Sequence, residues 1–264
     1  MATIRALPGF FVRDVDDDNA CVSQPRLFRK FSLATGSWAE LQARVTSLGA
    51  RDVKVVYLVR HAEGIHNAAE REFGTERWEA ECAKSDAYLD ADLTPFGIDD
   101  ARSKGPPAIA AERARGMPPI ERVVVSTLSR AIQTAEIFFA DYPPRAPFAS
   151  MELCREIMGV HTCDKRVSRS QLARKFPRVD VTRVADEEDV LWSPTHRETD
   201  EEIQARALVF LQQLFDAVPE RFVAVVTHSK FMRCLYDALL HGQKDVFPAN
   251  CEVVPLVLER VPAQ

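Results

Sequence analysis

The chain has 264 residues, of which 46% are hydrophobic and 28% are charged. This is an ordinary globular composition, with enough apolar residues for a large core, and it excludes disorder over most of the chain. The net charge of −5 at pH 7 excludes a general basic field for nucleic acid or an anionic membrane, but a local basic pocket for a small anion is compatible with it.

The first 51 residues lack a regular alternation of strands and helices. Within them, Trp38–Leu48 has the spacing of an amphipathic helix, and Ser37 is a suitable N-cap. We expect residues 1–51 to form an extension packed on or near a single domain spanning 52–264. The remainder of the chain contains neither an internal repeat nor a linker rich in glycine and serine.

Four apolar runs rich in β-branched residues predict buried strands, and stretches with helical spacing predict helices between them. The predicted strands are Val53–Val59, Arg122–Ser126, Phe222–Thr227 and Cys251–Leu258. The predicted helices are Ala101–Arg115, which Pro106 and Pro107 interrupt, Leu128–Phe139, Asp200–Val218 with Thr199 or Asp200 as its N-cap, and Ser229–Leu240. This alternation indicates an α/β fold, a three-layer sandwich in which helices flank a mostly parallel central sheet.

A charged and aromatic segment, Ala68–Asp92, lies between the end of the first of these strands and the next helix. Insertions at this place in α/β proteins often line binding sites. We therefore expect this segment to contribute to substrate specificity, together with Val160–Val190.

The cysteines are scattered and form no C-x-x-C pair, which favours reduced thiols. No apolar run approaches the ~20 residues that a membrane span needs. The chain begins without a sustained apolar stretch, so we expect no secretory signal and a cytoplasmic protein.

Polar motifs follow three of the predicted strands at their carboxyl ends. They are Arg60–Asn67 (RHAEGIHN), Ser126–Ala135 (STLSRAIQTA) and Thr227–Lys230 (THSK). A parallel sheet opens its ligand crevice at this edge, and the helices that follow can direct free N–H groups at a phosphate. Each motif is weak evidence alone, but together they predict an anion site built from histidines and arginines.

These motifs resemble those of the histidine phosphatase superfamily, also called the phosphoglycerate-mutase-like family. Arg60-His61 matches its signature, although Ala62 stands where glycine is usual. Arg130 matches the second arginine motif and His228 the second histidine motif. The segments RHAEGIHN, REIMGVHTCDKR, EEDVLW and VVTHSKFMR resemble the plant and fungal phosphatase-like branch.

The resemblance covers about 54–258 and implies a phosphoglycerate-mutase-like fold. It also implies that His61 is the nucleophile and forms a phosphohistidine, while Arg60, Arg130 and His228 hold the phosphoryl oxygens. His61 must be neutral to attack. The two nearby arginines disfavour its charged form, so we expect a lowered pKa for its imidazole.

The leaving oxygen needs a proton, which a carboxylate supplies in this family. Glu156 fits the family's spacing best, and Glu152 is the competing candidate. Asn67 matches a phosphate-contacting position, but its side chain would equally suit a helix N-cap. His66 is expected to orient groups or face the substrate. Ser229, which replaces a common glycine, would cap the following helix or touch the ligand.

The segment His161–Arg166 (HTCDKR) is specific to the resembling branch. Arg166, with Lys165, would meet a second anionic group of the substrate, or both would belong to a surface charge cluster. A zinc site at His161 and Cys163 is disfavoured because no second pair has ligand spacing. The acidic run 186–189 is read as a solvated face, followed by Leu191 and Trp192 near the pocket.

The sequence predicts a metal-independent phosphatase with no cofactor that hydrolyses a small phosphorylated metabolite. Its other partners are expected to include neither nucleic acid nor membrane, and its oligomeric state is open. One alternative is a phosphoglycerate mutase, which needs a strongly basic closed pocket, whereas the stretch after Asn67 is net acidic. The other is a catalytically silent phosphate-binding regulator, although every expected catalytic residue is present.

Overall fold

The computed structural model describes residues 2–13, 26–140, 147–240 and 246–262. Part of the predicted N-terminal extension, including Cys21, lies outside the described residues. Within the described ranges, no helix combines the length and apolarity that crossing a membrane requires.

The centre of the molecule is a seven-stranded sheet with the order β1-β9-β4-β8-β5-β6-β7, accompanied by a small two-stranded sheet, β2-β3. The strands from β4 to β7 in this order run parallel, whereas β9 is antiparallel to both of its neighbours. The strands are β1 (Thr3–Ala6), β2 (Phe11–Arg13), β3 (Phe31–Leu33), β4 (Asp52–Arg60), β5 (Arg122–Val125), β6 (Phe148–Ser150), β7 (Val179–Asp180), β8 (Phe222–Thr227) and β9 (Val253–Val261). The predicted mostly parallel sheet is therefore confirmed.

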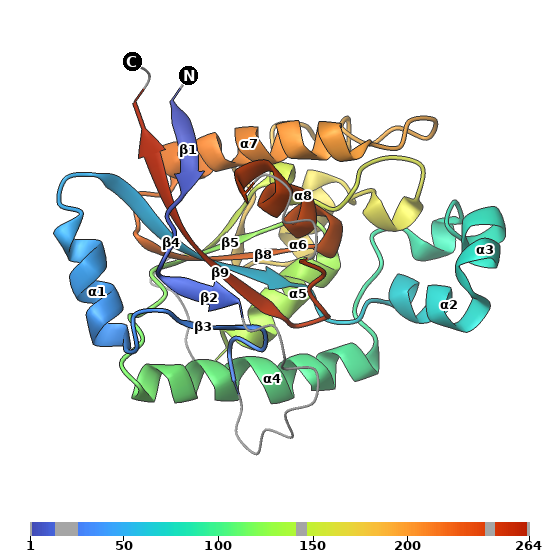
Figure 1. Cartoon of the computed structure of the whole chain (residues 1–264). Coiled ribbons are helices and arrows are strands. Elements are labelled where there is room, and N and C mark those ends of the chain that lie inside the picture. The colour runs from blue at the N-terminus through green and yellow to red at the C-terminus, as the bar shows by residue number, and fades with distance from the viewer. Residues whose placement is uncertain (1, 14–25, 141–146, 241–245, 263–264) are drawn as a thin grey trace.

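Helices cover both faces of the sheet, with α7 and α8 on one face and α4 and α5 on the other (Figure 1). Helices α2 and α3 stand beyond the end of the sheet towards which β4 points. The helices are α1 (Trp38–Ser47), α2 (Ile65–Phe73), α3 (Thr75–Arg77), α4 (Pro95–Ala114), α5 (Ser129–Phe138), α6 (Arg169–Lys175), α7 (Asp200–Ala217) and α8 (Ser229–Leu240). A π-helical turn, Trp78–Cys82, continues α3, and 3₁₀ turns lie at 86–88, 152–154 and 162–164.

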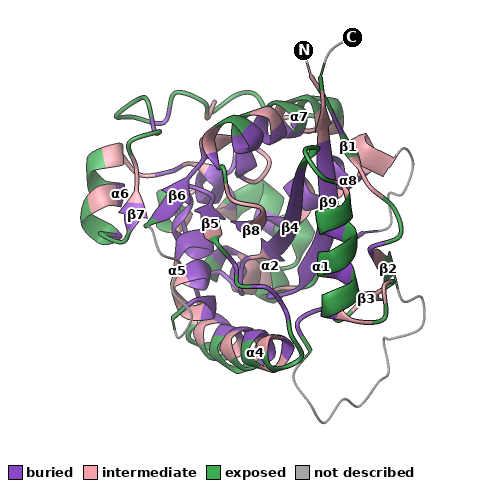
Figure 2. Ribbon diagram, turned by 90° about the vertical axis from the view of Figure 1, so that its left-hand side faces the viewer, coloured by how far each residue is buried: buried purple, intermediate pink, exposed green. Residues whose placement is uncertain are grey.

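The sequence pattern explains the main elements. The central residues of β4 and β8 are apolar and buried on both faces, as expected for strands covered by helices on each side (Figure 2). Helix α7 begins with a capping box in which Thr199 and Glu202 bond each other's backbone N–H groups. Helix α4 differs from the prediction: it starts at Pro95, capped by Thr94, and continues through both internal prolines.

The N-terminal residues are tied to the main sheet. Strand β1 forms its edge by pairing with β9, which brings the two ends of the chain side by side (Figure 1). Helix α1 begins after its predicted N-cap, Ser37, and buries Trp38 against Tyr57 and Phe28. The indole N–H of Trp38 donates to Glu112 of α4 at 2.8 Å. These contacts anchor the small layer formed by β2, β3 and α1 to the domain.

Candidate active site

The three polar motifs meet at the carboxyl ends of β4, β5 and β8. His61 and His228 follow two paired strands, and their ring centroids are 4.9 Å apart. His66, in the first turn of α2, has its ring 5.7 Å from that of His61. Arg130, in the first turn of α5, reaches the same place, because its Nε lies 3.3 Å from the His61 ring. The sheet thus gathers three histidines and an arginine in one buried cluster.

The backbone around His61 is fixed by three different segments. The His61 N–H donates to the carbonyl of Thr227 on β8 at 2.9 Å. The amide of Asn250 donates to the His61 carbonyl at 2.8 Å, and the N–H of Ala62 donates to Thr134 Oγ1 at 2.9 Å. The imidazole therefore has little freedom to leave its position.

The hydrogen bonds of the His61 imidazole select one tautomer. Nδ1 lies 2.6 Å from the Ala62 carbonyl, which can only accept, so Nδ1 carries the proton. Nε2 accepts a hydrogen bond from Arg130 Nε and therefore carries no proton. Burial, with Arg130 and Arg60 nearby, holds the pKa of His61 well below its usual range, so the ring is neutral at pH 7. The predicted lowering agrees in direction, but burial is the largest cause.

Arg130 is fully buried and has partners on each of its nitrogens. Besides the His61 ring, it donates from Nη1 to the Cys163 carbonyl at 2.6 Å and from Nη2 to Asp164 at 2.8 Å. These bonds use one N–H on each of its three nitrogens.

Arg60 ends β4 and lies at the same edge. Its Nη1 donates to the Pro248 carbonyl at 2.8 Å, and its buried Nε has no partner among the described residues. The ion pairs found among the described residues involve Arg130 but not Arg60. The Arg60 guanidinium is therefore the less committed of the two arginines expected to hold an anion.

His228 is held by Ser126, whose hydroxyl lies 2.8 Å from its Nε2, and its buried Nδ1 has no partner in the described part of the chain. Burial, with Arg130 and His61 nearby, keeps the pKa of His228 well below its usual range. A neutral ring of this kind has one N–H to donate. Whether Ser126 donates or accepts decides which nitrogen carries that proton.

His66 and Asn67 differ in how they are used. The ring of His66 lies over Gly64: a Cβ at position 64 would come within 2.7 Å of His66 Nδ1 and Cε1. Its buried Nδ1 has no described partner. Asn67 Oδ1 accepts from the Gly64 N–H at 3.1 Å, as a capping residue does, and this bond leaves the amide NH₂ for a ligand.

Glu156 lies at the N-terminus of α8. Its carboxylate is 3.3–3.4 Å from the N–H groups of Lys230 and Phe231 and from the Ser229 hydroxyl. Burial and the negative charge of Asp164 raise the pKa of Glu156, while Arg130 and Arg60 act in the opposite direction. Such a carboxyl group can hold a proton closer to neutral pH than an exposed glutamate.

The rival carboxylate, Glu152, is committed elsewhere. It accepts from Arg166 Nε at 2.6 Å and lies 3.7 Å from Arg155. These contacts hold it in a structural ion-pair network and favour Glu156 as the proton donor.

Arg166 is not available to a substrate, contrary to the sequence-based expectation. Its side chain is buried, and its remaining N–H groups donate to the carbonyls of Asp186, Glu187, Glu188 and Val167. Each guanidinium nitrogen is thus bonded within the protein. We therefore remove Arg166 from the set of ligand-binding candidates.

The acidic run 186–189 is likewise not a solvated face throughout. Asp189 is buried and bridges Arg155, at 2.5 and 2.8 Å, to the backbone N–H of Arg166. A buried arginine requires such a partner, and sequence spacing does not reveal it. The neighbouring Lys165 places its ammonium over the Trp192 ring, so Trp192 does pack against the HTCDKR segment.

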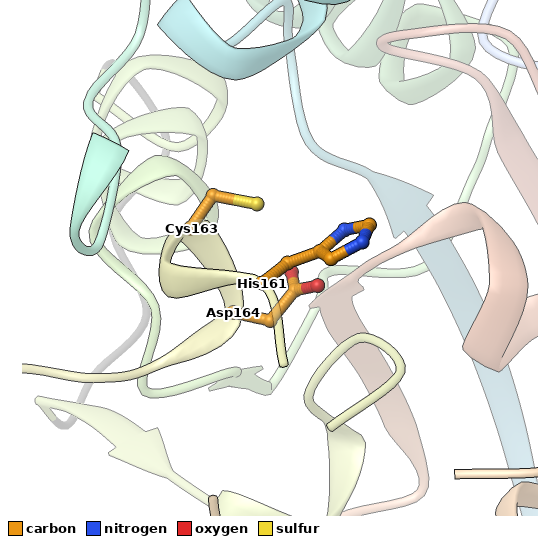
Figure 3. Close-up of side chains that lie close together, drawn as sticks. All are labelled: His161, Cys163 and Asp164. Carbon is orange, nitrogen blue, oxygen red and sulfur yellow. The ribbon is translucent and has the colours of Figure 1, made fainter. Parts of the chain in front are cut away.

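His161, Cys163 and Asp164 lie close enough to share a metal ion (Figure 3). Their donors, however, have other partners. The two ring nitrogens of His161 contact Glu79 and Arg197, and Asp164 pairs with Arg130 and Arg197. Burial and Asp164 raise the pKa of the Cys163 thiol well above its usual range, which opposes the thiolate that a metal requires. This group does not fit a metal ion.

Asp164 and Arg197 were not identified as site residues from the sequence. Arg197 donates from Nη1 to Asp164 and to the carbonyls of Ile157 and Gly159. Gly159, at φ +89°, permits this close turn, because a Cβ there would meet the His196 carbonyl at 1.7 Å. The only signal was the aspartate within HTCDKR, which the two neighbouring basic residues obscured.

Comparison with known proteins identifies related chains. A sequence model of the histidine phosphatase superfamily (branch 1) matches residues 56–260. A phosphoglycerate mutase-like protein of Arabidopsis thaliana is 32% identical over 241 residues, covering 78% of this chain and 84% of that protein. Phosphomutase-like protein 3 of Candida albicans is 30% identical over 253 residues, covering 92% and 76%. A solved phosphoglycerate mutase from Bacillus anthracis shares the fold, with a TM-score of 0.52, 18% identity and coverage of 78% and 88%.

Proposed function

The chain belongs to the histidine phosphatase superfamily, and from this premise we propose that it is a metal-independent phosphatase acting on a small phosphorylated metabolite. The observation that carries the proposal is the state of His61: a buried, neutral imidazole with its proton on Nδ1 and a lone pair on Nε2. That is the form of histidine that attacks phosphorus.

In the first step, His61 Nε2 attacks the phosphorus and the bond to the leaving oxygen breaks. Arg60, Arg130 and His228 donate to the non-bridging oxygens, and the two arginines neutralise the charge of these oxygens in a buried site. Asn67 and His66 add neutral donors. Glu156, in its acid form, gives its proton to the leaving alkoxide, so the alcohol departs neutral and the protein keeps a phosphohistidine.

In the second step, water attacks the phosphohistidine. Glu156, now a carboxylate, takes one proton from the water as the new P–O bond forms and the P–N bond breaks. Inorganic phosphate leaves, and His61 and Glu156 return to their initial states. Ser229, which lies 3.4 Å from the Glu156 carboxylate, holds this group in both steps.

The choice of phosphatase over mutase is supported by the charge balance around the cluster. Among the described ion pairs, Arg130 and Arg197 share Asp164, Arg155 pairs with Asp189, and Arg166 pairs with Glu152. Arg155 and Arg166 are thus neutralised, and Arg130 and Arg197 share one negative charge, which leaves little positive charge beyond that needed for one phosphate and disfavours the second phosphate of a mutase intermediate. The acidic stretch after Asn67 agrees with this proposal.

A phosphoglycerate mutase is the second candidate. The plant and fungal relatives and the bacterial structure carry names of the mutase or mutase-like kind. Mutase and phosphatase would share His61 and differ only in whether water or a sugar-acid hydroxyl accepts the phosphoryl group. The cytoplasmic location suggested by the cysteine pattern belongs to the same proposal and stays a prediction.

The test is a screen of the purified protein against phosphorylated sugars, acids and nucleotides, with and without a chelator. We expect phosphate release that the chelator does not reduce, and an acid-labile phosphoprotein after rapid quenching. His61→Asn should abolish both while leaving the circular dichroism spectrum unchanged. His196→Asn, at an exposed histidine paired with Glu202, is the matched control and should keep full activity.

Two results would contradict the proposal. Isomerisation of phosphoglycerate faster than phosphate release would assign the protein as a mutase. The absence of both turnover and the acid-labile adduct in the folded protein would assign it as the catalytically silent alternative.

A further inference from the structure

Asp164 is a buried charge for which the proposed chemistry has no use. It lies in a 3₁₀ turn, Thr162–Asp164, and its two carboxylate oxygens are divided between two guanidiniums. Oδ1 accepts from Arg130 Nη2 at 2.8 Å, and Oδ2 accepts from Arg197 Nη1 at 2.8 Å. Its backbone carbonyl accepts from Arg155 Nη2 at 2.6 Å. A carboxylate at a phosphate site repels the substrate, so its presence needs a reason.

We find a reason for the presence of Asp164 in the bond that Arg130 makes through its Nε atom. Arg130 Nε donates to His61 Nε2, the atom whose lone pair must attack phosphorus. While that bond exists, the lone pair is occupied, and Nε–H must turn to a phosphoryl oxygen before the attack. An arginine that shifted bodily towards the phosphate would lose its alignment with His61.

The geometry prevents such a bodily shift. Asp164 holds Nη2, and the Cys163 carbonyl holds Nη1 at 2.6 Å, so the far edge of the Arg130 guanidinium is fixed. Asp164 is itself fixed by Arg197, which the carbonyls of Ile157 and Gly159 hold in turn. With both Nη atoms held, the planar guanidinium can only tilt about the line that joins them, and this tilt moves Nε.

We propose that Asp164 is a positioning residue that anchors Arg130 by its Nη edge, so that the Nε–H alone transfers from His61 to the phosphoryl group when substrate binds. The inference rests on the proposed phosphohistidine chemistry. The arrangement is opposed by repulsion between Asp164 and the phosphate. In the free protein the lone pair of His61 Nε2 is hydrogen-bonded to Arg130, and when substrate binds it becomes available in line with the phosphorus.

The same carboxylate acts on the other titratable groups of the site. The charge of Asp164 raises the pKa of Glu156, whereas Arg130 and Arg60 lower it. Burial and Arg130 lower the pKa of His66, and the charge of Asp164 opposes that lowering. The pKa of Asp164 itself is lowered. Burial acts to raise this pKa, but the effects of Arg197, Arg130 and His66 outweigh burial. Removing the charge should therefore make Glu156 a stronger acid.

Asp164→Asn is the test, because asparagine keeps the shape but removes the charge and has an NH₂ group in place of one oxygen, so it can no longer accept from both Arg130 and Arg197. Turnover of a phosphomonoester is measured against pH, and inorganic phosphate binding is measured by calorimetry. Glu259→Gln is the matched control, because Glu259 also bridges two arginines, Arg5 and Arg51, at the opposite end of the sheet.

For Asp164→Asn we expect kcat to fall by about tenfold or more while inorganic phosphate binds up to about tenfold more tightly, because a nearby repelling charge is gone. The basic limb of the kcat profile should move to lower pH. Arg197→Gln should lower kcat as well, but weaken phosphate binding, because it removes a positive charge. Glu259→Gln should change none of these quantities.

A purely structural role predicts that Asp164→Asn weakens turnover and phosphate binding together, and that result would overturn the inference. So would an unchanged kcat. Should Asp164→Asn not fold, Arg197→Gln decides, since unchanged turnover in that folded variant contradicts the anchor. A wild-type protein that hydrolyses substrate while both variants stay fully active overturns only the inference. A wild-type protein without turnover, adduct or phosphate binding overturns the proposed function as well.

Discussion

Two carboxylates in this protein each bridge two arginines, and they lie at opposite ends of the sheet. Asp164 joins Arg130 and Arg197 at the end of the sheet that holds the proposed active site, called here the catalytic edge, where Arg130 is fully buried. Glu259, opposite the start of β4, joins Arg51 and Arg5, whose side chains are 40% and 59% exposed. The bonding pattern is the same, but the surroundings of the arginines differ.

This difference separates chemistry from stability. Water screens the exposed arginines around Glu259, so that bridge contributes a modest stabilisation and nothing to catalysis. Asp164 and Arg130 are buried and Arg197 is 26% exposed. At this site an unpaired charge is costly, and the position of each charge decides which bonds the reacting groups make. We therefore expect substitutions at the catalytic edge to change activity first, and substitutions at the opposite edge to change only stability.

The largest effect should come from Glu156→Gln, which removes the proposed proton donor but keeps the shape of the side chain. We expect kcat to fall by about 10³-fold for an alkyl phosphate, because general acid catalysis is lost. With an aryl phosphate, whose leaving group needs no proton, the first step should be affected much less, so the variant should release a burst of the aryl alcohol before the second step, which lacks its base, limits turnover. Since the pKa of Glu156 is raised, the wild-type kcat should fall as the pH rises through that pKa, and the variant should lack this limb.

Glu152→Gln is the control for that assignment, because Glu152 is the competing carboxylate. It should retain the basic limb and the leaving-group dependence of the wild-type protein. Loss of the limb in Glu152→Gln, with the limb kept in Glu156→Gln, would reverse the two roles.

A second prediction concerns stability at the catalytic edge. Arg155→Met leaves Asp189 buried without its partner, and we expect a loss of about 3–5 kcal/mol in the free energy of unfolding. The double variant Arg155→Met/Asp189→Leu should recover part of this loss, because no unpaired charge remains. Urea unfolding followed by circular dichroism measures both. Equal stability of the single and double variants would show that the buried pair is not coupled.

The sequence predicts the large elements of the fold and much of the site, because both depend on short-range patterns. Strands such as β4 and β8 are continuous apolar runs, and the histidine and arginine motifs follow them directly. The short strands β6 and β7, at one side of the sheet, have three and two residues, too few for a periodicity, so only tertiary pairing defines them.

The part of the site that the sequence does not predict is its ion pairing. Arg166 and Asp164 lie two residues apart, yet Arg166 forms an ion pair with Glu152, whereas Asp164 bridges Arg130 and Arg197. Which carboxylate meets which guanidinium depends on how distant loops pack. Local sequence therefore suggests a basic patch, whereas the structure shows a network in which most positive charges are already balanced.

The third prediction is smaller and concerns Gly64. In Gly64→Ala, the new Cβ would lie 2.7 Å from the ring of His66, which has to move. We expect kcat/KM to fall by about tenfold, because a misplaced donor weakens transition-state binding. In a His66→Ala background the same substitution should have little further effect. A full tenfold loss in that background would mean that the clash acts through the backbone and not through His66.

The smallest effect should come from Glu259→Gln, which tests the opposite end of the comparison. The hydrogen bonds of Arg51, opposed by burial, lower the pKa of Glu259 to about 2, so its stabilisation is present at neutral pH and is lost as the pH falls from about 4 towards 2. Since both arginines are substantially exposed, we expect a loss of only about 1 kcal/mol at pH 7. The stability difference between wild-type and variant proteins, measured by urea unfolding, should shrink in that acidic range, and kcat should be unchanged.

A difference that is independent of pH would mean that packing, and not charge, accounts for the effect of this residue. A change in kcat would mean that the two ends of the sheet are coupled, and the separation between chemistry and stability would then fail.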